Sequence, residues 1–261
     1  MESGLTLKKV DFEIKVSRYA GYPIGEANGG DRDPTAKQSS IVTDCVESGL
    51  RRFYFCGYKW SFLRPIATLS LASGASAVVL PDDFGGVEGR ISVSDTSDGI
   101  FNPVNFMNPM LVEQMYSESP DATGRPQVAS MRAIKGTDRQ KGQRNELYIF
   151  PIADARYVLK FQYYLLAGLP DVTHPFPYGG AEHSETILLS CLAVHEERYD
   201  NVMNGPQAMA FARQLSASQA MDNRKKEQVI GYNADNSDRF GSSIAFNYPA
   251  ALYNGVDFSD D

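Results

Sequence analysis

The sequence predicts an α+β fold, with a four-helix body, a small inserted antiparallel β domain and an extended C-terminal arm. Helical periodicity covers the chain to about residue 55 and returns only near residue 181. Between them, short runs alternate apolar and polar residues and are separated by Gly and Pro turns, which is typical of strands. The arm follows neither period. The predicted boundaries are 1–64 and 174–231 for the two helix pairs, 65–173 for the β domain and 232–261 for the arm.

Composition narrows the class of partner. The 261 residues carry a formal net charge of −7. Proteins that grip nucleic acid by its phosphates need clustered cations, so an acidic chain disfavours that role. An acidic wall past which DNA slides without sticking stays compatible with this charge. Three distant cysteines without a C-x-x-C pair indicate neither a disulfide framework nor a zinc site, and they favour a reducing compartment.

The first helix pair is predicted at residues 5–19 and 35–55. The first segment is ambiguous, because its apolar residues alternate like a strand and also fit helical spacing; we favour a helix. In the second segment Pro34 stands near the start, and an apolar stripe includes Val42, Leu50 and Phe53. Gly49 within that stripe indicates either the close approach of another helix or a tolerated defect.

Residues 50–65 form the predicted joint between the body and the β domain. The segment contains five of the chain's Phe and Tyr residues, its only tryptophan, Trp60, and four cations, of which Arg51 and Arg52 come first. Aromatic and basic residues together are also found where proteins stack on bases. We favour the alternative in which the rings pack at the edge of the core and the cations extend outward. Trp60 would then wedge between the body and the β domain.

The β domain is predicted from period-two runs between residues 66 and 165, with a turn at 81–86. Asn108 and Pro109 resemble an N-cap followed by proline at the first helical position, which predicts a short helix to about residue 116.

The second helix pair is predicted at 181–199 and from 206 to about 227. The middle of the first of these helices is apolar nearly all round, as expected of a central helix. Arg224, Lys225 and Lys226 stand at the C-terminal end of the last helix, where the helix dipole favours cations. Contact with an acidic partner or with DNA is the alternative role for these three residues.

The predicted arm is rich in apolar side chains for a segment without periodicity. Its aromatic residues include Phe240, Phe246, Tyr248 and Tyr253. We expect it to be an extended arm that docks on a neighbouring molecule. A disordered tail is the alternative.

No catalytic, cofactor-binding or metal site is predicted, so we expect no enzyme. His183 and His195 would lie roughly 18 Å apart along one helix, at about 1.5 Å per residue, and cannot share an ion. Asp83-Phe84-Gly85 matches a kinase magnesium motif, but no other kinase motif accompanies it, so we interpret it as a turn. Glu182 and Glu185 suit the first turn of a helix; acid catalysis in a cell-wall hydrolase is the alternative.

No membrane contact is expected. The first sixteen residues contain no continuous apolar run of the signal-peptide kind, and no run of about 18 apolar residues occurs anywhere.

An ordered series of motifs resembles one known family. The series is SGLRRFYF, WSFLRP, LPDDFG, TGRP, F-x-Y-x-L at residues 161–165 and PFPYGGAEHSETILLSCLA, and it falls between about residues 5 and 226. It resembles the head–tail adaptor, or connector, proteins of tailed bacteriophages, most nearly the tail tubular protein A type of short-tailed phages. No single motif is decisive, and the order of the motifs carries the resemblance.

The resemblance implies a structural protein of the virion neck that assembles in the host cytoplasm. Family members form a ring, usually of twelve copies, between the portal protein and a downstream tail or nozzle protein. Genomic DNA passes through the lumen without sequence-specific contact. Another tail-ring component, such as a stopper, is the alternative within this class. A small-molecule binding module is a further alternative, and it would require a polar-lined pocket in the β domain.

Overall fold

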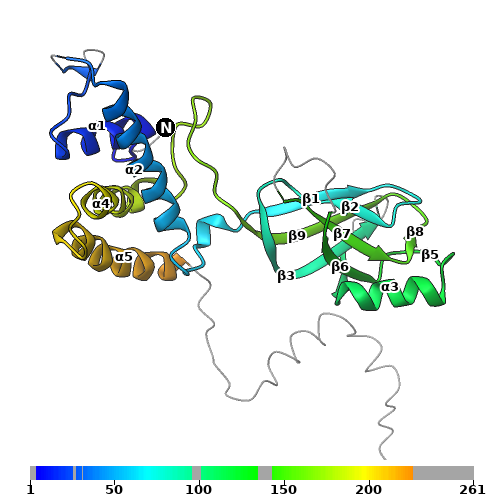
Figure 1. Ribbon diagram of the computed structural model, residues 1–261. Helices are drawn as coiled ribbons and strands as arrows, with labels where there is room; N and C mark the ends of the chain where they lie inside the picture. The colour runs from blue at the N-terminus through cyan, green and yellow to red at the C-terminus, as the bar shows by residue number, and fades with distance from the viewer. Residues whose placement is uncertain (1–3, 26–27, 31, 96–100, 135–142, 226–261) are drawn as a thin grey trace, which may run out of the picture. The chain divides into compact units, whose positions relative to one another are not determined.

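The structure of the protein is a computed structural model, and it describes residues 4–25, 28–30, 32–95, 101–134 and 143–225 (Figure 1). Nearly all of these residues belong to one unit, Met1–Asn223; a second unit begins at Arg224. The predicted C-terminal arm lies outside the described residues. The predicted domain boundaries stay a prediction.

Four helices flank the strands in the sequence, two on each side. They are α1 (Lys9–Tyr19), α2 (Ala36–Tyr54), α4 (Gly180–Arg198) and α5 (Pro206–Lys225). Helix α2 packs along α4, and α1 contacts both of them (Figure 1). The first and second predicted helix pairs therefore pack on each other, although about 120 residues separate them in the chain.

The ambiguous N-terminal segment is helical. Its start is fixed locally, because the Asp11 carboxylate accepts the Lys8 backbone N–H at 2.8 Å. Phe12, Val16 and Ser17 are its buried residues. Phe12 and Val16 are four residues apart and share one face of the helix, whereas Val10 is 47% exposed. Val10 and Ile14, also four residues apart, lie on the opposite side of the helix, so two apolar stripes interleave in the sequence and imitate the alternation of a strand.

Helix α2 begins with a capping box. Thr35 Oγ1 accepts the Gln38 backbone N–H, and Gln38 Oε1 accepts the Thr35 backbone N–H. On the buried face, a Cβ added to Gly49 would lie 2.6 Å from Cys191 Cα on α4. Ser190 Oγ also donates to the Gly49 carbonyl at 2.8 Å. Of the two alternatives for Gly49, the structure shows the close approach of another helix, and α4 is that helix.

The central segment folds into a seven-stranded sheet with the order β1-β9-β3-β4-β6-β7-β2. All neighbouring strands are antiparallel except β4 and β6, which are parallel. The two edge strands, β1 and β2, lie beside each other, so the sheet is close to a closed barrel. Two further strands, β5 and β8, pair in parallel. The strands are β1 (Ile66–Leu71), β2 (Ala77–Val79), β3 (Phe84–Asp95), β4 (Phe101–Phe106), β5 (Thr123–Gly124), β6 (Val128–Ala133), β7 (Asn145–Phe150), β8 (Ile152–Ala153) and β9 (Tyr157–Leu165).

Helix α3 (Pro109–Glu118) packs on β6 and β7 and belongs with the strands. Asn108 is its N-cap and accepts the Met110 backbone N–H at 2.9 Å, as the Asn-Pro pair predicts. Val112 is fully buried beside Val128 and Tyr148. These residues make a second, smaller apolar cluster, separate from the main core.

The predicted fold class is wrong. The described chain has five α-helices and a large, nearly barrel-shaped sheet, so it is not a four-helix body with a small antiparallel β insert. One apolar core runs from the helices into the sheet and contains Phe12, Trp60 and Leu159. The predicted turn at 81–86 is also wrong in part, because β3 already begins at Phe84. The 12-residue strand β3 is not recognisable in the sequence from Phe84 onward, because Gly85, Gly86 and Gly89 interrupt the apolar alternation that is typical of strands.

The Gly49 contact gives a test of helix packing. Replacing Gly49 with alanine places a methyl group against the α4 backbone, so we expect a loss of about 1–3 kcal/mol in the free energy of unfolding. Urea denaturation measures it. Gly168→Ala is the matched control, because nothing lies within 4 Å of an added Cβ there and that variant should be near neutral. Equal stability of the two variants would contradict the close approach.

Candidate interaction site at the joint

Trp60 lies at the centre of the joint and is fully buried. Its ring centroid is 4.6 Å from that of Phe53, 5.4 Å from Phe62 and 5.1 Å from His183 on α4. The indole Nε1–H donates to the Phe53 carbonyl at 3.3 Å, which satisfies the one polar atom of the ring. A fully buried ring offers no face to a nucleic-acid base, so the packing role that we favoured is the one that fits this geometry.

Two residues of the joint bind helix α5 through one buried carboxylate. Asp222 is fully buried, and its oxygens accept the Ser61 backbone N–H at 3.0 and 3.2 Å. The Tyr58 hydroxyl donates to the same carboxylate at 3.0 Å. Desolvation, followed by the contact with Asp222, raises the pKa of Tyr58 to about 12, so its proton stays available for this bond at neutral pH.

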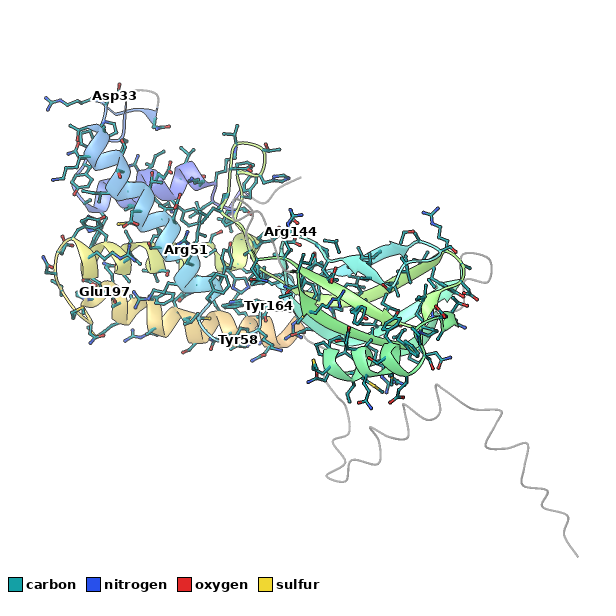
Figure 2. The ribbon with its side chains drawn as sticks, turned by 45° about the vertical axis from the view of Figure 1, so that its right-hand side comes forward. Asp33, Arg51, Tyr58, Arg144, Tyr164 and Glu197 are labelled. Atoms are coloured by element: carbon teal, nitrogen blue, oxygen red, sulfur yellow. The ribbon has the colours of Figure 1, made fainter. Side chains whose placement is uncertain are left out.

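The two neighbouring arginines of the joint have different surroundings. The Arg52 guanidinium forms two hydrogen bonds to Glu197 on α4, at 2.9 and 3.0 Å, and lies over the Phe211 ring of α5. Arg52 therefore connects α2 to α4 and α5. Arg51 is exposed; Figure 2 labels it and also Glu197, the partner of Arg52. One turn later, Phe55 is 55% exposed, so an exposed cation and an exposed ring stand together at the end of α2.

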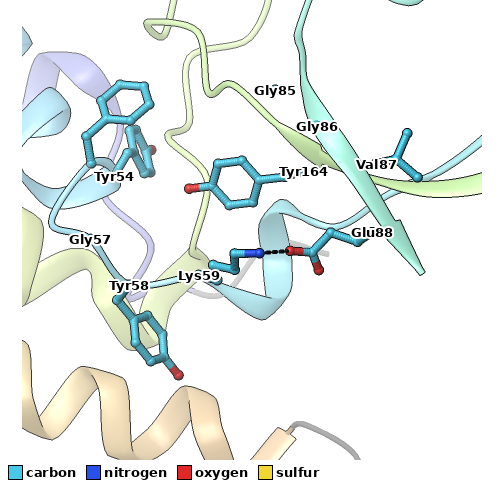
Figure 3. A pocket seen from close by; sticks show the side chains of 10 residues that line it. Tyr54, Gly57, Tyr58, Lys59, Gly85, Gly86, Val87, Glu88 and Tyr164 are labelled. Atoms are coloured by element: carbon cyan, nitrogen blue, oxygen red, sulfur yellow. Dashed lines mark hydrogen bonds and ion pairs between the residues drawn. The ribbon is translucent and has the colours of Figure 1, made fainter. Parts of the chain in front are cut away.

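A pocket of about 310 Å³ opens beside the exposed ring (Figure 3). Residues 54–59 of the joint form one wall, and β3 and β9 form the other. Tyr164 extends from β9 into the space between these walls (Figure 3). The residues that line the pocket are Tyr54, Phe55, Gly57, Tyr58, Lys59, Gly85, Gly86, Val87, Glu88 and Tyr164.

The rim of this pocket carries excess positive charge. Glu88 pairs with Lys59 at 2.9 Å through one oxygen and with Arg64 at 3.1 Å through the other. Two cations thus share one carboxylate. Lys59 and Glu88 line the pocket, whereas Arg64 pairs with Glu88 from outside the lining residues, and the three groups together carry about one net positive charge. Lys59 is 70% exposed at its side chain, so its part of the charge faces solvent. The pocket is therefore aromatic inside and weakly basic at its edge, which suits an apolar group next to an anion.

The remaining predicted site residues are not gathered at this pocket. Arg224 and Lys225 are exposed in the last turn of α5, where the negative end of the helix dipole stabilises cations. Lys226, Phe240, Phe246, Tyr248 and Tyr253 lie outside the described residues. Glu182 and Glu185 are exposed on the first turns of α4.

Sequence reasoning missed the buried polar groups near the end of α4. Glu196 is only 4% exposed and accepts the backbone N–H groups of Gln207 and Ala208, so it caps α5 across the fold. His195 is 3% exposed, and its Nδ1 lies 3.3 Å from an Asp200 carboxylate oxygen. A local pattern could not reveal either position, because the groups that cover them come from other segments.

No group of three His, Cys, Asp or Glu side chains in the described residues could hold a metal ion. Within the same residues, none of the helices has the length and hydropathy needed to cross a membrane. Comparison with protein-family models and with curated protein sequences finds no match to this chain.

Trp60 provides the sharpest test of the joint. Replacing it with alanine removes a fully buried ring at the meeting point of α2, α4 and the joint, so we expect a loss of about 3–5 kcal/mol in unfolding free energy. Chemical denaturation measures the loss. Phe55→Ala is the control, since that ring is 55% exposed and its removal should cost much less. If Trp60→Ala melts like the parent protein, the packing described for the joint is incorrect.

Proposed function

We propose that the chain is the subunit of a bacteriophage head-to-tail adaptor. In this proposal, copies of the chain form a ring. Rings of the family that the sequence resembles usually contain twelve copies. The ring joins the portal protein to the downstream tail or nozzle protein and completes the channel for genomic DNA. The protein is structural, without a catalytic centre, and its place is the neck of the virion.

One observation carries the proposal: the motifs on which the resemblance rests meet in space. SGLRRFYF supplies Gly49 and Phe53, WSFLRP supplies Trp60, and the long last motif supplies His183 and Cys191. Cys191 lies against Gly49, and Phe53, Trp60 and His183 are in ring contact with one another. Segments more than 100 residues apart therefore build one cluster. A chance resemblance in scattered short motifs would give no reason for them to converge.

Two motifs of the sheet, LPDDFG and TGRP, also lie at contacts between elements. In LPDDFG, Phe84 stacks on Tyr163 of β9, and Asp83 accepts the Tyr163 hydroxyl at 3.2 Å. In TGRP, Arg125 donates to the Val93 carbonyl of β3 at 3.0 Å. Every motif of the series thus supports the framework of the fold, which is the role expected of residues that identify a structural subunit. The net charge of −7 further supports a wall that DNA passes without being held.

The test is the composition and assembly of the phage particle. We expect the protein in purified virions by mass spectrometry, and a ring at the portal in electron-microscopy class averages of the purified protein mixed with portal. Deleting its gene should leave filled or leaking heads without tails. Absence from the virion, or a strictly monomeric protein in the presence of portal, would overturn the proposal. A ring located below another ring, rather than on the portal, would indicate a stopper instead.

A further inference from the structure

The loop between β9 and α4 is held rigidly at both ends. On the sheet side, the Leu166 N–H donates to the Asp83 carbonyl at 2.7 Å. On the helical side, the Lys9 N–H donates to the Pro175 carbonyl at 2.9 Å, and the Tyr54 hydroxyl donates to the Tyr178 carbonyl. The loop, yellow-green in Figure 1, is therefore tied to the sheet, α1 and α2.

The tip of this loop, residues 171–174, is a tight turn with an apolar side chain at its end. The His174 N–H donates to the Asp171 carboxylate at 2.6 Å, and the Asp171 N–H donates back to the His174 carbonyl at 3.1 Å. All four residues are exposed, and Val172 is 100% exposed. Buried prolines flank the turn at 170 and 177. The turn thus presents a valine in a fixed position, so little conformational entropy would be lost when it binds.

The tip and the pocket at the joint are complementary in chemistry. The tip offers an aliphatic side chain next to a carboxylate. Hydrogen bonding from the His174 backbone lowers the pKa of Asp171, which keeps this group ionised at neutral pH. The pocket offers Phe55 and Tyr164 as apolar walls, with Lys59 and Arg64 sharing Glu88 at the rim. The aliphatic tip matches the aromatic interior, and the anion matches the net positive rim.

We propose that the 171–174 tip of one copy inserts into the joint pocket of the next copy. Two different surfaces then meet, and such a head-to-tail contact repeats from copy to copy and can close into a ring. This inference rests on the proposed adaptor function, which requires a ring, and it names the surfaces that form it. The occupant of the pocket is a second copy of this chain, which brings the aliphatic side chain and the carboxylate of the tip.

Cross-linking between two separately purified variants tests the contact. One carries Val172→Cys, the other Phe55→Cys, and both carry Cys56→Ser; the other native cysteines, Cys45 and Cys191, are buried. Mixed and oxidised with copper phenanthroline, they should give a covalent dimer with the 55–172 disulfide, identified by peptide mass. As the control, Val79→Cys replaces Val172→Cys; Val79 is a different valine, 51% exposed, and this variant should give no such dimer.

A second measurement separates this inference from the adaptor proposal. Val172→Asp adds a charge at a fully exposed position, so the protein should stay folded while the concentration for half-assembly rises roughly tenfold or more. Val79→Asp should leave assembly unchanged. Rings that form normally with Val172→Asp and without the disulfide would overturn the inference and leave the adaptor function intact. A chain that never assembles, even with portal, would overturn both.

Discussion

The packing of Trp60 is the interaction on which the rest of the structure depends. The ring is fully buried, and it contacts Phe53 at the end of α2, Phe62 in the joint and His183 on α4. Its polar atom is satisfied within the joint, so burial of the ring carries no unpaired donor. Through this point the buried residues of the helices, the joint and the sheet form one contiguous apolar core. Tyr58, whose ring centroid is 4.8 Å from that of Trp60, also lines the pocket beside it.

Helix α5 is attached by directional bonds more than by apolar burial. Its buried apolar residues are Ala208 and Phe211, which is little for a helix of 20 residues. Two buried carboxylates hold it instead: Glu196 receives its first backbone N–H groups, and Asp222 binds the joint near its last turn. Hydrogen bonds to charged groups contribute about 1.5–3 kcal/mol each to stability, and they require a specific geometry of donor and acceptor. The position of α5 therefore depends on its contacts with the joint and with α4.

Much of the local structure could be predicted from residue patterns. The Asn108-Pro109 pair predicts a helix start that the structure confirms, Pro34 stands close to the observed start of α2, and close approach is one of the two alternatives for Gly49. These features depend on neighbours within a turn or on one face of a helix, so the sequence expresses them directly. The size of the sheet could not be predicted, because strand pairing joins distant segments and β3 contains three glycines. The parallel pair of β4 and β6 likewise has no local signature.

The sequence by itself determined the helix starts, the buried faces and the joint as a segment of concentrated aromatic residues. It also carried the ordered motifs on which the adaptor proposal rests. Only the tertiary structure decided the nearly closed sheet, the burial of His195 and Glu196, and the two exposed features, Val172 and the pocket rim. Burial and pocket shape arise where segments far apart in the chain meet, and local periodicity records which side of an element is apolar but not what covers it.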